Sequence, residues 1–528
     1  MLKHTRKAKT QFVLALLVMI ALLGAPAAYA AAPGITGPTF NLTAQPAFIT
    51  QPDGSMIYSW GYGCNGAPSG YAPSAISGSS CSNMQVPGPT LIVTQGQTVT
   101  ITLTNNLPAA AGNTSILFPG FQVSSPAGSG VAGLLTQEAV PGGTVTYTFT
   151  ATSPGTRSYY SGTQSDLQVE MGLYGAIIVV PSSVPAACSS GVHTSNLSAQ
   201  AHWGEHNFRL AAAAYNHPGA CYDREYLFQF SEIDPRVHRQ AEEQLALINS
   251  CVPTAGMPCP AALSVATEPY VPAYFMVNGR SMPDLMDPNY APEYPHQPYN
   301  GNPHMHPGEL VLLRIIGQGH WQHPFHEHGN HVRVLARDGN LIPSATNPET
   351  NLAGPLLFTT TTTPGQSIDG IYYWTGKGLN WDPFGHGPTA TPTASCVPDA
   401  NGYNTGDPNA INYFEWCQDH NKPLQTTPVG AIAGGGPATL PDPNIFANGA
   451  WYGGSPYLGP EATIRAVGTT GTTPPSGTIA NSPTDEAGFA FMWHSHNERE
   501  ITTNNIFPGG MMMMMLVDSR EFVIDESN

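Results

Sequence analysis

The sequence predicts an all-β protein made of two tandem β domains, and three features of its composition support this. Glycine and proline are frequent, with 56 and 51 residues among 528, and they interrupt short apolar runs. Charged residues make up only 10% of the chain, far fewer than a helical bundle or a coiled coil needs. Hydrophobic residues make up 41%, which is enough for packed cores and argues against a disordered chain.

The first 30 residues, 1–30, have the features of a secretory signal peptide. Basic residues between Lys3 and Lys9 precede an apolar stretch, Phe12–Leu23, and Ala28 and Ala30 fit the small-residue cleavage rule. The apolar stretch is too short for a comfortable membrane span, and an uncleaved anchor is the alternative. We therefore expect an exported protein, periplasmic or extracellular, with no membrane span after signal cleavage.

The chain is acidic, with a formal net charge of −17, and loss of the basic signal peptide would make it more so. Nucleic acid and anionic lipid are both negatively charged and would be repelled. We therefore expect neither as a partner.

The eight cysteines are even in number, which in an exported chain favours disulfide bonds. Many pairings are open to eight cysteines, and proximity in the sequence is the only guide. It suggests the pairs Cys64–Cys81, Cys188–Cys221, Cys251–Cys259 and Cys396–Cys417.

The first β domain is expected over residues 40–182. Four segments there are rich in β-branched residues or alternate between apolar and polar residues, as strands do: 90–94, 98–104, 144–150 and 175–180. A linker is expected over 183–220. The second domain then covers 221–520, and its expected strands are 225–230, 274–277, 309–316, 332–335, 489–493 and a methionine-rich final strand.

Two features interrupt the second domain. A helix is predicted after Asp234, which can cap it, with Pro235 in the first turn and Val237, Ala241, Leu245 and Ile248 on one face. A stretch rich in glycine, proline and asparagine, about 376–460, is expected to be an insertion pinned by a disulfide, because so long a structureless segment is implausible inside a core.

Histidines are concentrated in the second domain. Eight of the 18 fall between His296 and His331, and a second cluster contains His494 and His496. In a strand, two residues separated by one lie on the same face about 7 Å apart, so an HxH pair can hold a metal ion. Two such pairs on neighbouring strands would offer four nitrogens, which suit copper, zinc, iron or nickel.

The alternative is that these histidines are surface residues or buried structural ones, but two tight pairs within apolar strands favour a metal site. His304 and His306 form a further HxH pair that follows turn-like residues. We expect this pair to lie in an exposed loop.

Residues 86–182 and 220–520 resemble the multicopper oxidases, which are built from cupredoxin domains. VPGPTLIVTQGQTV (Val86–Val99) and MGLYGAIIV (Met171–Val179) are similar to motifs of the family's first domain. HPFHEHG (His323–Gly329) matches the HPxHxHG signature, and WHSH (Trp493–His496) followed by PGGM is similar to the closing one. The resemblance implies tandem cupredoxin-like Greek-key β-sandwich domains, two rather than the usual three.

The resemblance also implies copper ligands. His323 would bind the blue, type 1 copper and His326 the type 2 copper, while His328, His494 and His496 would bind the type 3 pair. Leu117, Pro119, Ser161 and Thr163 stand where the four remaining ligands of the family's first domain would be.

The blue site is incomplete as well. Ser495 stands at its cysteine position and Glu500 at a further histidine position. Blue copper requires a thiolate, so the resemblance does not extend to a laccase-type four-electron oxidase. What remains is a reduced site of His326, His328, His494 and His496, with His323 as a further ligand, for copper. With an added oxygen ligand the site would also admit zinc, iron or manganese.

Other side chains near the reduced site are candidate contributors. Glu327, Glu498 and Glu500 could add an oxygen ligand or a hydrogen bond to a ligand. The run Met511–Met515 offers thioethers for Cu(I), but alternation along a strand prevents all five from lining one site, and core packing is the alternative.

Two functions follow from these observations. The first is an exported, multicopper-oxidase-like protein that binds copper through second-domain histidines, with at most a reduced oxidoreductase activity on an unknown small molecule. The second is a non-catalytic cupredoxin scaffold for binding or assembly. The family's two-domain members assemble as homo-oligomers with copper at subunit interfaces, but identical subunits cannot restore the missing ligands.

Overall fold

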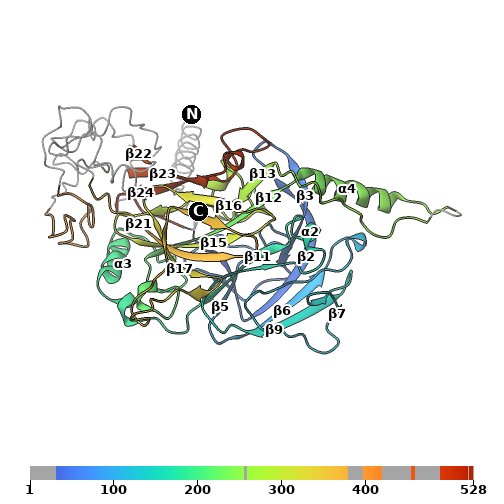
Figure 1. Cartoon of the computed structure of the whole chain (residues 1–528), viewed down its shortest axis with the longest axis horizontal. Helices are drawn as coiled ribbons and strands as arrows, with labels where there is room; N and C mark the ends of the chain where they lie inside the picture. Colours follow the sequence, from blue (N-terminus) through green and yellow to red (C-terminus); the bar gives the residue numbers. More distant parts are fainter. Residues whose placement is uncertain are drawn as a thin grey trace, which may run out of the picture.

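The computed structural model describes residues 31–254, 258–378, 384, 397–418, 454–457, 488–520 and 522–526. The expected signal peptide and most of the expected insertion lie outside these residues, as does Cys396. The described chain forms two β sandwiches, with the second domain on the left of Figure 1 and the first at the lower right. None of the helices in the described part has the length and apolar character needed to span a bilayer.

The first domain packs a five-stranded sheet against a four-stranded sheet. The five-stranded sheet has the order β10 (Gly155–Tyr160), β11 (Tyr174–Val180), β5 (Leu91–Thr94), β1 (Gly34–Thr36) and β4 (Tyr71–Ala72). The four-stranded sheet has the order β3 (Met56–Cys64), β2 (Thr39–Thr50), β6 (Thr98–Asn105) and β9 (Thr144–Thr150). A small hairpin joins β7 (Val131–Ala132) to β8 (Gln137–Glu138).

Alternation explains the first domain's core. Along β6, Val99, Ile101 and Leu103 are fully buried while the threonines between them are not. These apolar residues pack with Leu91 and Ile177 of the opposite sheet. The core therefore lies between the two sheets, as it does in a sandwich.

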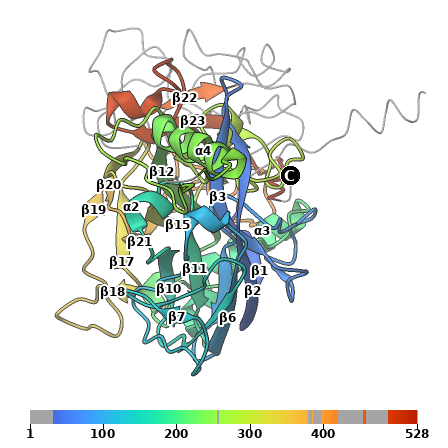
Figure 2. The ribbon, with the colours of Figure 1, turned by 90° about the vertical axis from the view of Figure 1, so that its right-hand side faces the viewer.

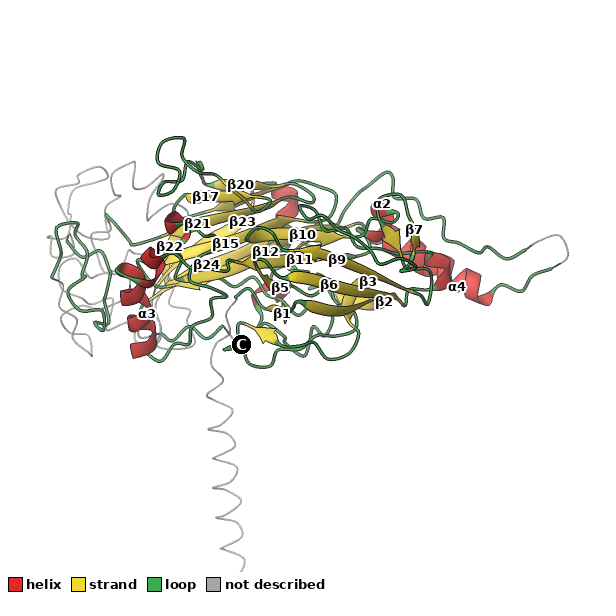
Figure 3. Cartoon of the chain, turned by 90° about the horizontal axis from the view of Figure 1, so that it is seen from below, coloured by secondary structure: helices red, strands yellow, loops and turns green. Residues whose placement is uncertain are grey.

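The second domain packs two larger sheets in the same way. The first has the order β13 (Tyr274–Val277), β12 (Arg224–Ile233), β15 (Leu310–Gly317), β21 (Ser367–Tyr373), β17 (Val332–Arg337) and β18 (Asn340–Leu341), with β19 (Leu356–Leu357) beside β17. The second has the order β14 (His304–Met305), β24 (Met512–Asp518), β23 (Gly488–Ser495), β16 (His323–Glu327) and β20 (Thr359–Thr362), with β22 (Gly454–Tyr457) beside β23. Figure 3 shows these strands in yellow.

Helices are few and lie at the edges of the sandwiches (Figure 3). Within the described residues the α-helices are α2 (Ser165–Gln168), α3 (Val192–His202) and α4 (Pro235–Ser250). The short 3₁₀ helices in the same described part are η1 (Ala109–Ala111), η2 (Ala186–Ser189), η3 (Pro218–Ala220), η4 (Asp284–Met286) and η5 (Glu498–Ile501). The segment expected to be a linker, 183–220, thus contains the 11-residue helix α3.

Helix α4 confirms the predicted helix. The Asp234 side chain accepts a hydrogen bond from the Arg236 backbone N–H and so caps its first turn. Val237 and Ala241 pack into the core of the first domain, although the chain enters the helix from β12 of the second domain. Figure 2 shows α4 lying in front of β3.

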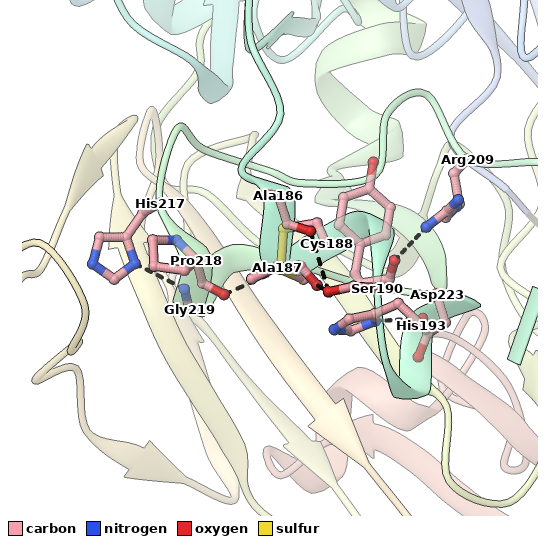
Figure 4. The surroundings of a disulfide bond; sticks show 12 residues. Ala186, Ala187, Cys188, Ser190, His193, Arg209, His217, Pro218, Gly219 and Asp223 are labelled. Atoms are coloured by element: carbon pink, nitrogen blue, oxygen red, sulfur yellow. Dashed lines mark hydrogen bonds and ion pairs between the residues drawn. A yellow bond between two sulfur atoms is a disulfide. The ribbon is translucent and has the colours of Figure 1, made fainter. Parts of the chain in front are cut away.

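The predicted strands are confirmed as β5, β6, β9, β11, β12, β13, β15, β17, β23 and β24. Three disulfide pairings are confirmed as well: Cys64–Cys81, Cys188–Cys221 and Cys251–Cys259. The second of these ties η2 to the residue after η3 (Figure 4). Close to it, the His193 imidazole of α3 lies 2.7 Å from the Asp223 carboxylate.

Candidate metal centre

Four histidines gather on the outer face of two paired strands of the second domain. Phe325 of β16 lies opposite Ser495 of β23, and His326 lies opposite His494. Alternate residues point to opposite faces, and Phe325 and Trp493 are both buried in the domain core. His326, His328, His494 and His496 therefore share the other face.

The imidazoles of this group are close enough to share one ion. A nitrogen of each of His326, His328 and His494 lies within 4.8 Å of the others. Nε2 of His494 lies 3.2 Å from Nε2 of His328. The His496 ring centroid lies 4.7 Å from that of His326, and His496 is exposed to solvent.

Neighbouring groups orient the rings. The Thr359 hydroxyl of β20 lies 2.7 Å from Nδ1 of His326, and the Ser495 carbonyl oxygen lies 2.7 Å from Nδ1 of His494. This second contact leaves Nε2 of His494 facing His328. Such contacts fix the tautomer of a histidine that binds a metal through its other nitrogen.

His326 and His494 carry no charge at neutral pH. Burial, and then the neighbouring imidazoles, lower the pKa of His326 to about 4. Burial is also the largest cause of the lowered pKa of His494. A neutral imidazole is the form that binds a metal, and three or four of them suit copper or zinc.

Two family models described as "Multicopper oxidase" match residues 74–184 and 266–371. The chain belongs to the multicopper oxidase family. The fold agrees with this, since both domains are mixed β sandwiches, and the match at 266–371 includes His323, His326 and His328. The family binds copper, and the histidine group supplies donors that fit it.

Relatives with curated names match over short segments only. An L-ascorbate oxidase of Brassica rapa subsp. pekinensis is 39% identical over 98 residues, which is 18% of this chain and 16% of that protein. Laccase abr2 of Aspergillus fumigatus is 37% identical over 100 residues, 19% of this chain and 16% of that protein. The matched segments thus span less than a fifth of the relatives' length.

Solved structures are similar at lower identity. The multicopper oxidase mgLAC gives a TM-score of 0.43 at 15% identity, covering 91% of this chain and 85% of that one. A blue copper oxidase from Nitrosomonas europaea gives a TM-score of 0.43 at 14% identity, covering 90% of this chain and 85% of that one.

Protein groups surround His323, the residue that the resemblance assigns to blue copper. His323 is fully buried and does not join the histidine group described above. Its Nδ1 lies 2.9 Å from Oε2 of Glu500, and the Ser495 hydroxyl donates to the same oxygen at 2.5 Å. Its Nε2 lies 2.8 Å from Oε2 of Glu232. A carboxylate oxygen thus stands between the side chains that would hold the metal, and the residues do not fit blue copper.

Histidine ligands are also absent from the four first-domain positions. The Ser161 hydroxyl donates to Oε1 of Gln168 at 2.6 Å, and the Thr163 hydroxyl donates to Oε1 of Glu138 at 2.9 Å. Leu117 packs against Gly162, and Pro119 supplies no donor atom. These positions of the first domain thus carry a hydrogen-bonded polar network and an apolar side chain.

The expectation that His304 and His306 lie in an exposed loop is wrong. His304 belongs to β14, and both side chains are buried. Nδ1 of His304 lies 2.5 Å from the Asp518 carboxylate, and Nε2 of His306 lies 2.5 Å from that of Glu205. These acids are distant in sequence, so the local pattern gave no sign of them.

This buried cluster is organised by an arginine. Arg224 forms ion pairs with Glu205, Glu309 and Glu526. Although His306 lies with Glu205 and Glu309 in a geometry that could hold an ion, the guanidinium already compensates the acids. We assign the cluster a structural role in joining β12, β14 and the end of the chain.

Two of the three glutamates near the histidine motifs have hydrogen-bond partners outside the histidine group. Glu500 binds His323 and Ser495, and the buried Glu327 accepts a hydrogen bond from Thr360. Glu498 is exposed in η5.

Proposed function

We propose that this chain is an exported, copper-binding member of the multicopper oxidase family that lacks the laccase-type four-electron activity. It holds a single copper ion on His326, His328 and His494, with the exposed His496 available as a fourth ligand. The observation that carries the proposal is the convergence of three imidazoles on one sheet face. The domain boundaries of 40–182 and 221–520, with an insertion at about 376–460, are part of the same proposal.

The missing electron path limits the chemistry. A blue copper passes electrons through its cysteine thiolate, and a serine hydroxyl engaged with Glu500 cannot replace it. A histidine-bound copper with an open position could still bind water or a small oxidisable molecule. The protein would then have at most a reduced oxidoreductase activity.

Export is supported by two independent features. The basic, apolar and small-residue segments of the first 30 residues are typical of a signal peptide. Three disulfide bonds are typical of an oxidising compartment.

Copper loading tests the proposal directly. We expect the purified mature protein to retain one copper per chain after loading and desalting, with a paramagnetic spectrum of nitrogen-ligated Cu(II) and no intense thiolate band. His326→Ala combined with His494→Ala should abolish that copper. The matched control, His202→Ala with His206→Ala, replaces two exposed histidines and should leave the copper content unchanged.

Three outcomes would contradict this function. Unchanged copper in the His326→Ala/His494→Ala protein would place the site elsewhere, and an intense thiolate band would contradict the assignment of Ser495. Near-zero copper in the wild-type protein would favour the second candidate, a non-catalytic scaffold. That candidate is supported by the loss of every first-domain ligand at Leu117, Pro119, Ser161 and Thr163.

A further inference from the structure

Strand register places methionines beside the histidine group. In the pairing of β23 with β24, His494 lies opposite Met512, and Met492 lies opposite Met514. Residues directly opposite each other in an antiparallel pair share a sheet face. The row that contains His326 and His494 therefore continues to Met512, and the next row on that face contains Met492 and Met514.

The methionine run is divided between the two faces of the sheet. Met511, Met513 and Met515 are fully buried in the core of the second domain, between its two sheets. Met512 is 7% exposed, and Met492 and Met514 are half-buried on the opposite face. Packing between the two sheets accounts for the inward residues, whereas the outward ones lie outside that core. We call Met492, Met512 and Met514 the outer methionines.

The spacing of the outer methionines suits a shared ligand. Opposed residues have Cβ atoms about 5 Å apart, and alternate residues along a strand are about 7 Å apart. Methionine side chains are unbranched and flexible, so three of them at these spacings can bring their sulfur atoms to one point. Thioethers are soft donors that favour Cu(I), whereas the neighbouring imidazoles also accept Cu(II).

We propose that the outer methionines form a Cu(I) site next to the histidine group. The ligand is the cuprous ion, bound by thioether sulfur, and His494 lies at the boundary between the two sets of donors. The site gives the chain affinity for the reduced ion that the imidazoles alone would not select. The statement that this site lies beside a second copper centre rests on the function proposed above. The binding of Cu(I) by the outer methionines does not rest on it.

The decisive experiment asks whether sulfur atoms coordinate the bound ion. The mature protein is loaded anaerobically with Cu(I), and the metal's X-ray absorption spectrum is recorded; Ag(I), which is soft and does not change its oxidation state, serves as a second probe. We expect a sulfur shell around the bound ion. Met492→Leu with Met512→Leu and Met514→Leu should lose that shell and the Cu(I) it holds.

Leucine keeps most of the volume of methionine, so this variant should fold. The matched control is Met511→Leu with Met513→Leu and Met515→Leu, which changes the same strand on its inward face and should keep the sulfur shell. Since these core changes could impair folding, Met56→Leu, at a residue 59% exposed in the first domain, is a second control.

Failure of this site can be told apart from failure of the histidine site. The His326→Ala/His494→Ala protein should lose bound Cu(II) and keep sulfur-bound Cu(I). A wild-type protein whose Cu(I) has only nitrogen and oxygen neighbours would overturn the inference, as would an outer-methionine variant that keeps the sulfur shell. Neither result would change the outcome of the Cu(II)-loading experiment, which tests the histidine group.

Discussion

The surroundings of His323 determine the charge of this buried histidine. Both of its ring nitrogens face carboxylates, from Glu232 and Glu500, and none of the three side chains is exposed. Burial alone would lower the pKa of His323, but the hydrogen bonds to the two glutamates and their charges raise it to about 9. The imidazole is therefore protonated at neutral pH and lies between two carboxyl groups.

This arrangement predicts a specific pH dependence of stability. Because the pKa of His323 is higher in the folded protein than the unperturbed 6.5, its contribution is complete below pH 6.5 and is lost as the pH rises through about 9. Glu500→Gln removes one of the two carboxyl groups that face the His323 imidazole, and should lower the free energy of unfolding at pH 7 by about 3 kcal/mol. The same substitution should also reduce the decrease in the free energy of unfolding between pH 6.5 and 9.

Urea unfolding between pH 6 and 10 measures this effect. Glu498→Gln is the matched control, because Glu498 is an exposed residue of the same short helix. Parallel pH profiles for wild type and Glu500→Gln would show that His323 is not a buried cation.

Sequence patterns predicted one histidine cluster and misplaced the other. The HxH spacing correctly implied that His326 and His328, like His494 and His496, share a face, because alternation is local. The burial of His304 and His306 depends on Asp518 and Glu205, which are 214 and 101 residues away in sequence. The same holds for Glu232, 91 residues from His323, which the sequence gave no reason to place there.

At the scale of elements, strands and one helix were predictable because their patterns are periodic. Helix α4 has a capping residue, a proline in its first turn and an apolar face. Helix α3 has none of these: no side chain caps it, and the buried positions include His193, Asn196 and Gln200. It is held by tertiary contacts such as the hydrogen bond from Asn196 to Asp223, which no local pattern reveals.

The cap of α4 gives a second prediction. Asp234 accepts hydrogen bonds from the backbone N–H groups of Arg236 and Val271. Asp234→Ala should lower the free energy of unfolding by about 1–2 kcal/mol, since it leaves these donors without that acceptor. Chemical denaturation measures the change, and Glu243→Ala, on the exposed face of the same helix, should cost much less. Equal effects of the two substitutions would contradict the capping role.

At the scale of the whole molecule, the two sandwiches share a buried interface. Ile233, Tyr274 and Met276 of the second domain pack with Val86 and Tyr174 of the first. Polar groups cross the same boundary: the Ser158 hydroxyl donates to Oε1 of Gln318 at 2.7 Å. Such packing couples the folding of two domains more tightly than a linker alone would.

Asp369 is the centre of a polar network across this interface, and it provides the last prediction. From β21 of the second domain, its carboxylate accepts hydrogen bonds from the Thr156 N–H and hydroxyl of β10 in the first domain, and from the Tyr215 hydroxyl. The side chain is buried, so Asp369→Ala leaves several donors without this acceptor, at about 1–3 kcal/mol for each unsatisfied group. Calorimetry should show one unfolding transition for the wild-type protein and two for Asp369→Ala, because the loss falls on the contacts that couple the domains rather than on either core. Glu349→Ala, at an exposed carboxylate of the second domain, should retain the single transition. A single transition in Asp369→Ala with an unchanged midpoint would show that the apolar contacts alone couple the two sandwiches.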